Sequence, residues 1–221
     1  MGLLAIALGF GVTYAIPMSR GAYSAPWYVH LHGASALSWI LLLLVQATLI
    51  RHSWTPSHRR LGKLALPIAA VVWTTGIATA GWAAARDLPL LGTPATSSLA
   101  GTVTGLSIFL VLAGAALVMR RRPDWHKRLA LLATIQLLWP AFFRLRHLLP
   151  MVPKPEVTLA LALAYSPILL AAVRDRWRYG RVHPVWLYVG TALILEQSLE
   201  VAFFDQGLQR DFGVWLYAML N

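Results

Sequence analysis

The sequence predicts an all-α fold, a polytopic transmembrane helix bundle of about seven spans with its N-terminus inside and its C-terminus outside. Hydrophobic residues make up 58% of the 221 residues and charged residues only 12%, which is too little polar surface for a water-soluble protein of this size. Several apolar runs reach the roughly 20 residues that cross about 30 Å of hydrocarbon. The alternating pattern of a membrane β-barrel is absent from the sequence.

The apolar runs define the predicted spans, at residues 3–19, 28–50, 61–83, 99–119, 129–149, 158–173 and 184–204. We interpret residues 1–221 as a single membrane domain. Residues 28–149 form its four-helix core, and the spans at 3–19, 158–173 and 184–204 are additional. The stretch from Asp87 to Ser98 is expected to be an outer loop, and the apolar C-terminal DFGVWLYAML to be a contact surface or a helix lying on the membrane.

Thirteen of the nineteen Lys and Arg residues lie in three loops, RHSWTPSHRRLGK, RRRPDWHKR and RDRWRYGRV. Short loops rich in Lys and Arg stay on the cytoplasmic side, so these three loops set the predicted orientation. The net charge of +11 is thereby explained by topology, and we expect the lipid bilayer rather than a nucleic acid as the partner. The high Ala, Leu and Arg content favours a bacterial cytoplasmic (inner) membrane as the location.

Several chemistries are excluded by missing residues. The chain has no cysteine, which rules out disulfides, thiolate metal ligands and iron–sulfur clusters. It also lacks a P-loop, an HExxH motif, a GxSxG motif and the dense histidine boxes of membrane di-iron enzymes.

A short internal repeat links the first two basic loops to the helices that follow them. SHRRLGKLALPIA resembles WHKRLALLATIQ, and each places a histidine and basic residues just before a span. We interpret His52, His58 and His126 as interface residues whose side chains hydrogen-bond helix ends.

Ionisable side chains within a bilayer are costly and therefore mark candidate sites. With the predicted topology, the candidates all fall in the outer half of the membrane: His30, His32, Arg144, Arg146, His147, Glu196 and Glu200. Helical spacing groups them into polar faces on three spans: His32, Trp39 and Gln46; Gln136, Phe143 and His147; and Glu196 and Glu200. His30 points elsewhere.

We interpret these faces as a haem or metal site near the outer surface. His32 and His147 are the expected ligands, Arg144 and Glu196 the charges beside them, and Trp39, Gln46 and Gln136 further cofactor-binding residues. A transition metal would instead be held by His30, His32, His147 and Glu200. Two alternatives stay open: Glu196 or Glu200 pairs with Arg144 or Arg146 to hold the bundle together, and Trp39 is a packing residue.

The motifs YVHLHGASALSWILLLLVQATLI, SHRRLGKL and WHKRLALLATIQLLWPAFFRL resemble an uncharacterised family of bacterial predicted polytopic membrane proteins. The motif positions are His32, Trp39, Gln46, His58, Arg59, Gly62, His126, Arg128 and Leu129. More distantly, the helix pairs are similar to transmembrane haem b cytochromes, and this resemblance implies haem b held between paired histidines. The predicted fourth span departs from that pattern because it has no histidine.

Three functions follow from this reading. The first is a haem- or metal-binding redox or electron-transfer protein, with a quinone or another membrane protein as its partner. The second is a non-catalytic subunit or assembly factor of a larger membrane complex. The third is a metal-dependent membrane enzyme that acts on a lipid-like substrate with Glu196 or Glu200 as general base. The sequence leaves open whether the protein is an enzyme.

Overall fold

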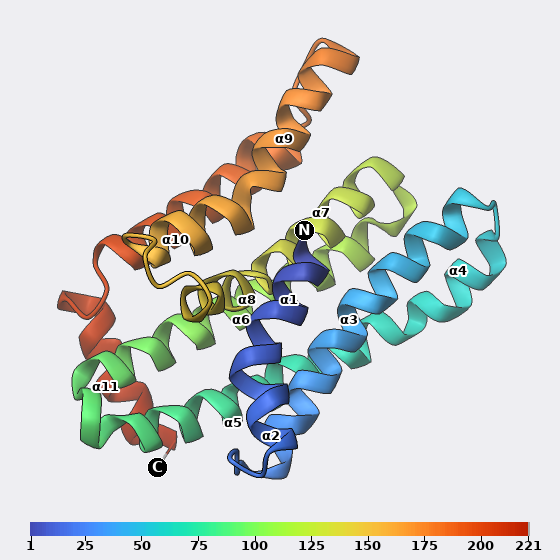
Figure 1. Cartoon of the computed structure of the whole chain (residues 1–221). Helices are drawn as coiled ribbons and strands as arrows, with labels where there is room; N and C mark the ends of the chain where they lie inside the picture. Colours follow the sequence, from blue (N-terminus) through green and yellow to red (C-terminus); the bar gives the residue numbers. More distant parts are fainter. Residues whose placement is uncertain (221) are drawn as a thin grey trace. The chain divides into compact units, whose positions relative to one another are not determined.

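The computed structural model describes residues 1–220, and this part of the chain is helical, with no strand (Figure 1). In chain order the α-helices are α1 (Gly2–Phe10), α2 (Ile16–Ser19), α3 (Trp27–Arg51), α4 (Thr55–Leu61), α5 (Ala65–Leu91), α6 (Thr93–Val118), α7 (Pro123–Gln136), α8 (Trp139–Arg144), α9 (Ala162–Tyr179), α10 (Thr191–Ala202) and α11 (Gly207–Leu220). Short 3-10 or π-helical segments extend several of them, at Gly11–Ala15, Gly62–Leu64, Met119–Arg121, Leu145–His147, Glu156–Leu161 and Val185–Gly190.

The helices are long and apolar enough to cross a membrane. Within residues 1–220 six stretches qualify, at Gly2–Ser19, Trp27–Arg51, Thr55–Leu91, Thr93–Arg121, Pro123–His147 and Glu156–Tyr179. A seventh is present if Val185–Ala202 and Gly207–Leu220, which are bent by 86° at their junction, form one broken span. The predicted all-α polytopic bundle of about seven spans is confirmed.

The predicted loop from Asp87 to Ser98 is wrong, because the chain is helical on both sides of a single turn at Gly92. Gly92 has a φ of 67°, which glycine adopts without steric cost, and this allows the chain to reverse between α5 and α6. Pro94 then stands in the first turn of α6, where a missing N–H costs nothing.

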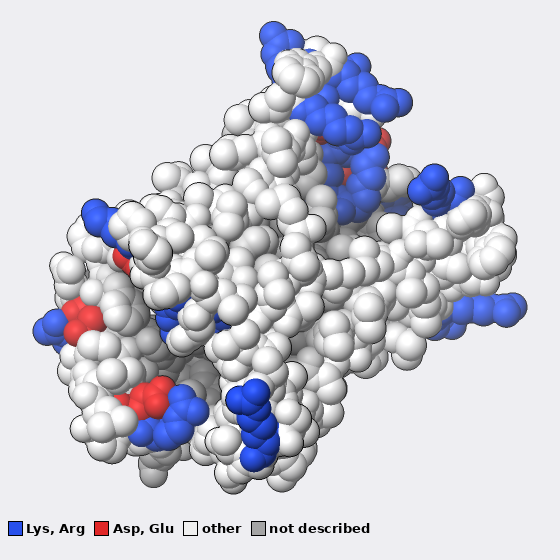
Figure 2. All heavy atoms as spheres, in the orientation of Figure 1, with Lys and Arg blue, Asp and Glu red and all other residues white. Residues whose placement is uncertain are grey.

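Charged side chains gather at helix ends rather than along helix sides. Figure 2 shows this at the C-terminal end of α9, where Lys and Arg form a dense cluster while the visible sides of the helices are mostly uncharged. The last turns of α9 and the loop after it contain the basic residues of the third predicted cytoplasmic loop, Arg174, Arg176, Arg178 and Arg181. This distribution is typical of helices whose sides face lipid and whose ends face water.

The chain divides into two compact units. Unit 1 comprises Met1–Ala25 and Ile135–Ala202, and unit 2 comprises Pro26–Thr134 together with the chain from Phe203 onward. The four-helix core expected at residues 28–149 coincides with unit 2 only as far as Thr134. The single-domain interpretation stays a prediction.

Unit 2 is built around α5, which packs against both α3 and α6. Phe109 on α6 is fully buried, and its ring meets the indole of Trp39 edge-on at 4.9 Å between centroids. The Trp39 Nε1 atom also donates a hydrogen bond of 3.1 Å to the hydroxyl of Thr134 on α7. Trp39 therefore ties α3 to α6 and α7, which agrees with its interpretation as a packing residue.

The C-terminal helix α11 belongs to unit 2, where it packs against α6. A Cβ atom on Gly213 would lie 2.5 Å from the carbonyl oxygen of Thr96, so the two backbones are in close contact. Asp205, in the turn before α11, accepts hydrogen bonds from Thr93 at 3.0 Å and Ser97 at 2.9 Å. The C-terminal segment is therefore an apolar helix that packs against α6 of the same chain.

In unit 1, a proline interrupts the fifth predicted span. Pro140 has no N–H, so the carbonyl group of Gln136 loses its helical partner, and α7 ends at Gln136 while α8 begins at Trp139. Helix α1 packs closely on α8, because a Cβ atom on Gly9 would lie 2.6 Å from the carbonyl oxygen of Ala141.

Candidate functional site

The polar face predicted on α3 lies against its neighbours in unit 2. The His32 Nδ1 atom is 3.2 Å from the carbonyl oxygen of Val72 on α5. Gly76, one turn further along α5, leaves room for the imidazole, because a Cβ atom there would approach the His32 ring to 2.9 Å. At the other end of the face, a Cβ atom on Gly62 would lie 3.0 Å from the Gln46 Nε2 atom.

Gln46 has an unsatisfied acceptor. Its Oε1 atom is buried and has no hydrogen-bond partner within residues 1–220. A buried amide oxygen without a donor costs about 1–3 kcal/mol, so such an atom marks a place where a further donor would be stabilising.

Two histidine rings lie side by side where the two repeated motifs meet. His58 on α4 and His126 on α7 have ring centroids 6.2 Å apart, with the ring planes at 86°. The His126 Nδ1 atom is 2.7 Å from the carbonyl oxygen of Ala116, near the end of α6, which agrees with the expected hydrogen bond to a helix end. The His58 Nδ1 atom is buried and has no hydrogen-bond partner among the described residues.

Sequence reasoning missed this pairing, although the repeat contained the signal. SHRRLGKL and WHKRLALL put a histidine at the same position relative to the starts of two helices, α4 and α7. Because α4 leads into α5 and His126 lies in the first turn of α7, both histidines belong to the basic, predicted cytoplasmic end of unit 2. Within unit 2, His32 lies near the first turn of α3, whereas His58 lies just beyond the last turn of that helix.

Unit 1 contains a buried polar network that links three helices. The Tyr165 hydroxyl on α9 lies 2.9 Å from the Oε1 atom of Gln136 and 3.2 Å from the Oε1 atom of Gln197. It has one proton, so it donates to one of them, and the shorter contact favours Gln136. The Gln197 Nε2 atom donates to the Glu200 carboxylate at 3.2 Å. Gln136, Tyr165 and Gln197 are all buried.

Glu196 and Glu200 have no cationic partner in this network. Within residues 1–220 no ion pair joins either carboxylate to Arg144 or Arg146, so the ion-pair alternative is not observed. The Glu196 Oε2 atom is buried without a hydrogen-bond partner in the described part of the chain. Glu200 instead accepts a hydrogen bond from the Gln197 amide.

The two arginines of α8 and the segment after it stack on phenylalanine rings. The Arg144 guanidinium lies 4.3 Å from the ring centroid of Phe10 and donates a hydrogen bond of 3.0 Å to the carbonyl of Pro140. Arg146 covers the ring of Phe143 at 3.8 Å. The first contact attaches α8 to α1, and the second attaches the segment Leu145–His147 to α8.

The helix is interrupted within the predicted face of Gln136, Phe143 and His147, and the shared face stays a prediction. Gln136 ends α7 and is 6% exposed, whereas His147 lies in the 3-10 segment after α8 and is exposed. The break at Pro140 lies between them and ends the helical periodicity on which the expectation depended.

The predicted ligands are divided between the two units. His30, His32, Trp39 and Gln46 belong to unit 2, and Gln136, Arg144, His147, Glu196 and Glu200 to unit 1. In the described part of the chain no group of three His, Asp or Glu side chains is placed to hold a metal ion. The outer-face ligand set, His32 with His147, stays a prediction.

Comparisons with protein-family models, with curated proteins and with solved structures find no match for this chain. The fold alone therefore defines its class, a multi-pass α-helical integral membrane protein.

Proposed function

We propose that this chain is a haem-binding redox protein of the membrane, in which His58 and His126 would hold the haem iron. The observation that carries this proposal is the 6.2 Å separation of the two imidazole centroids. An iron bound by two imidazoles, each nitrogen roughly 2 Å away, holds the ring centres about 6 Å apart. The proposal keeps the haem function expected from the sequence and assigns it to the basic end of unit 2.

The environment of the two rings supports ligation. A metal-bound histidine usually donates its second ring nitrogen to a carbonyl or carboxylate, which fixes the tautomer, and His126 has such a partner in the carbonyl of Ala116. The buried Nδ1 atom of His58 has no hydrogen-bond partner among the described residues, so a bond to a metal ion would satisfy it. A haem bound here would supply one-electron chemistry. The protein would exchange electrons with a quinone or another membrane protein.

The surrounding charge suits an anionic cofactor. The loop Arg51–Lys63 contains Arg51, Arg59, Arg60 and Lys63 without an acidic residue, and Arg120, Arg121, Arg122, Lys127 and Arg128 belong to the second basic loop. Haem propionates are carboxylates, which arginine binds well through two parallel hydrogen bonds. Arg59, which follows His58 on α4, would bind a propionate, while the two histidines would bind the iron.

The experiment is a haem titration of the purified protein, followed by the Soret absorbance. The wild type is expected to bind one haem per chain, and His58→Ala and His126→Ala to weaken binding by at least about tenfold. His52→Ala is the matched control, because His52 lies in the same loop but packs beside Trp54 with ring centroids 5.8 Å apart. Equal binding by all three variants would refute the assignment, and loss in His32→Ala and His147→Ala instead would restore the outer-face site.

A further inference from the structure

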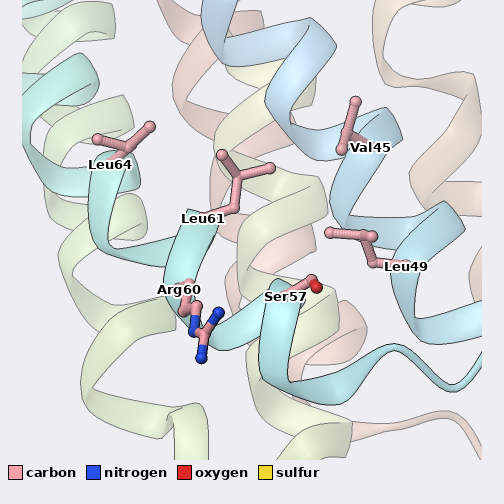
Figure 3. Close-up of a pocket in the computed structure, with 6 residues that line it drawn as sticks. All are labelled: Val45, Leu49, Ser57, Arg60, Leu61 and Leu64. Atoms are coloured by element: carbon pink, nitrogen blue, oxygen red, sulfur yellow. The ribbon is translucent and has the colours of Figure 1, made fainter.

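An open groove of about 520 Å³ runs along the outside of unit 2, between α3 and α4. It is lined by Val45 and Leu49 from α3, and by Ser57, Arg60, Leu61 and Leu64 from α4 and the turn that follows. Figure 3 shows the Ser57 hydroxyl and the Arg60 guanidinium at one end, with the aliphatic side chains above them. The groove therefore has a polar, cationic end and an apolar remainder.

The short helix α4 presents different faces to the groove and to the histidine pair. Ser57, Arg60 and Leu61 are three and four residues apart, so they share one side of the helix. His58, one residue on from Ser57, is turned about 100° away and meets His126. Occupancy of the groove would therefore stabilise α4 without involving the histidine rings.

The charge around the groove selects among lipids. The segment Arg51–Lys63 has four Lys or Arg residues and no Asp or Glu, and Arg60 itself lines the groove. The positive-inside rule places this loop on the cytoplasmic side, where anionic lipids give the leaflet its negative surface potential. A phospholipid matches both ends, because its phosphate fits the Arg60 end and an acyl chain fits the aliphatic remainder.

We propose that this groove is a binding site for one anionic phospholipid, whose phosphate contacts Arg60 and Ser57 and whose acyl chain lies against Val45, Leu49, Leu61 and Leu64. The proposal is independent of the haem proposal. Each basic side chain near the surface contributes about 1 kcal/mol to attraction of an anionic lipid, so removal of Arg60 is expected to lower affinity about fivefold.

The test is native mass spectrometry of the full chain, released from detergent with added phosphatidylglycerol or, separately, phosphatidylcholine. Wild type is expected to retain one phosphatidylglycerol, and Arg60→Gln to retain about fivefold less. Arg121→Gln, which removes an equal charge from the other basic loop, is expected to behave as wild type. Val45→Trp, which fills the apolar end and leaves the charge unchanged, is expected to reduce retention as well.

Two outcomes would overturn the site. Equal losses in Arg60→Gln and Arg121→Gln would mean that the lipid responds only to the diffuse charge of the basic loops. Equal retention of phosphatidylglycerol and phosphatidylcholine by the wild type would mean that the groove takes any acyl chain.

Discussion

The Tyr165 hydroxyl on α9 lies 2.9 Å from the Gln136 side-chain oxygen at the end of α7. Both residues are buried, and Gln197 on α10 completes the contact from a third helix. The hydroxyl therefore holds together three helices of unit 1 at the point where the fifth span is broken.

Tyr165→Phe is expected to destabilise the protein by about 1–3 kcal/mol, because it leaves one buried amide oxygen without its donor. Thermal unfolding in detergent measures the change. Tyr188→Phe is the control, since Tyr188 is 70% exposed, and it is expected to have no effect. Equal unfolding temperatures for the two variants would show that the network does not stabilise unit 1.

The Trp39–Thr134 hydrogen bond is expected to couple α3 to α7. In a double-mutant cycle of Trp39→Phe and Thr134→Val, we expect an interaction energy of about 0.6–1.5 kcal/mol, as is usual for hydrogen bonds between transmembrane helices. The Phe ring keeps the packing against Phe109, so the cycle isolates the hydrogen bond. Additive single-mutant effects would contradict the coupling.

Gly213→Ala is expected to destabilise the packing of α11 on α6 by about 1–3 kcal/mol, because the new Cβ atom would meet the Thr96 carbonyl. Limited proteolysis of the C-terminal helix reports the loss as faster cleavage. Gly114→Ala on α6 is the matched control, since nothing lies within 4 Å of its Cβ position. It is expected to be neutral or to stabilise the helix slightly.

The stability of the folded protein is expected to depend on pH through the carboxyl group of Asp205. Partial burial would raise its pKa, but hydrogen bonds from Ser97, Thr93 and Arg210 outweigh this and hold the pKa below its usual value. A carboxyl group whose pKa is lower in the folded than in the unfolded protein stabilises the folded state at any pH above its unfolded pKa. This stabilisation is lost as the pH falls through the folded pKa. Asp205→Asn is therefore expected to lower the unfolding temperature near neutral pH and to match wild type in strong acid. A constant difference across pH would contradict this.

The spacing of apolar and polar residues predicted the spans and the polar face of α3, because both depend on regular helical periodicity. The spacing did not predict the two places where a helix is interrupted or the chain turns. Pro140 breaks the span between Gln136 and His147, and Gly92 turns the chain where a loop was expected. These two residues were visible in the sequence, but their consequences depend on the packing of neighbouring helices.

The His58–His126 contact required the tertiary structure, because 67 residues separate the two positions along the chain. Only the similarity of SHRRLGKL to WHKRLALL connected them beforehand. Tyr165 gave no signal in the sequence for a different reason, because a tyrosine side chain carries no charge and only charged or imidazole groups mark an intramembrane site by their cost.

The most direct measurement of the proposed function is the electron paramagnetic resonance spectrum of the oxidised, haem-loaded protein. Two histidine ligands predict a low-spin signal in the wild type, and a high-spin signal in His58→Ala or His126→Ala, each of which would leave one ligand. A low-spin signal that persists in both variants, or a wild-type protein that binds no haem, would contradict the assignment of His58 and His126 as ligands.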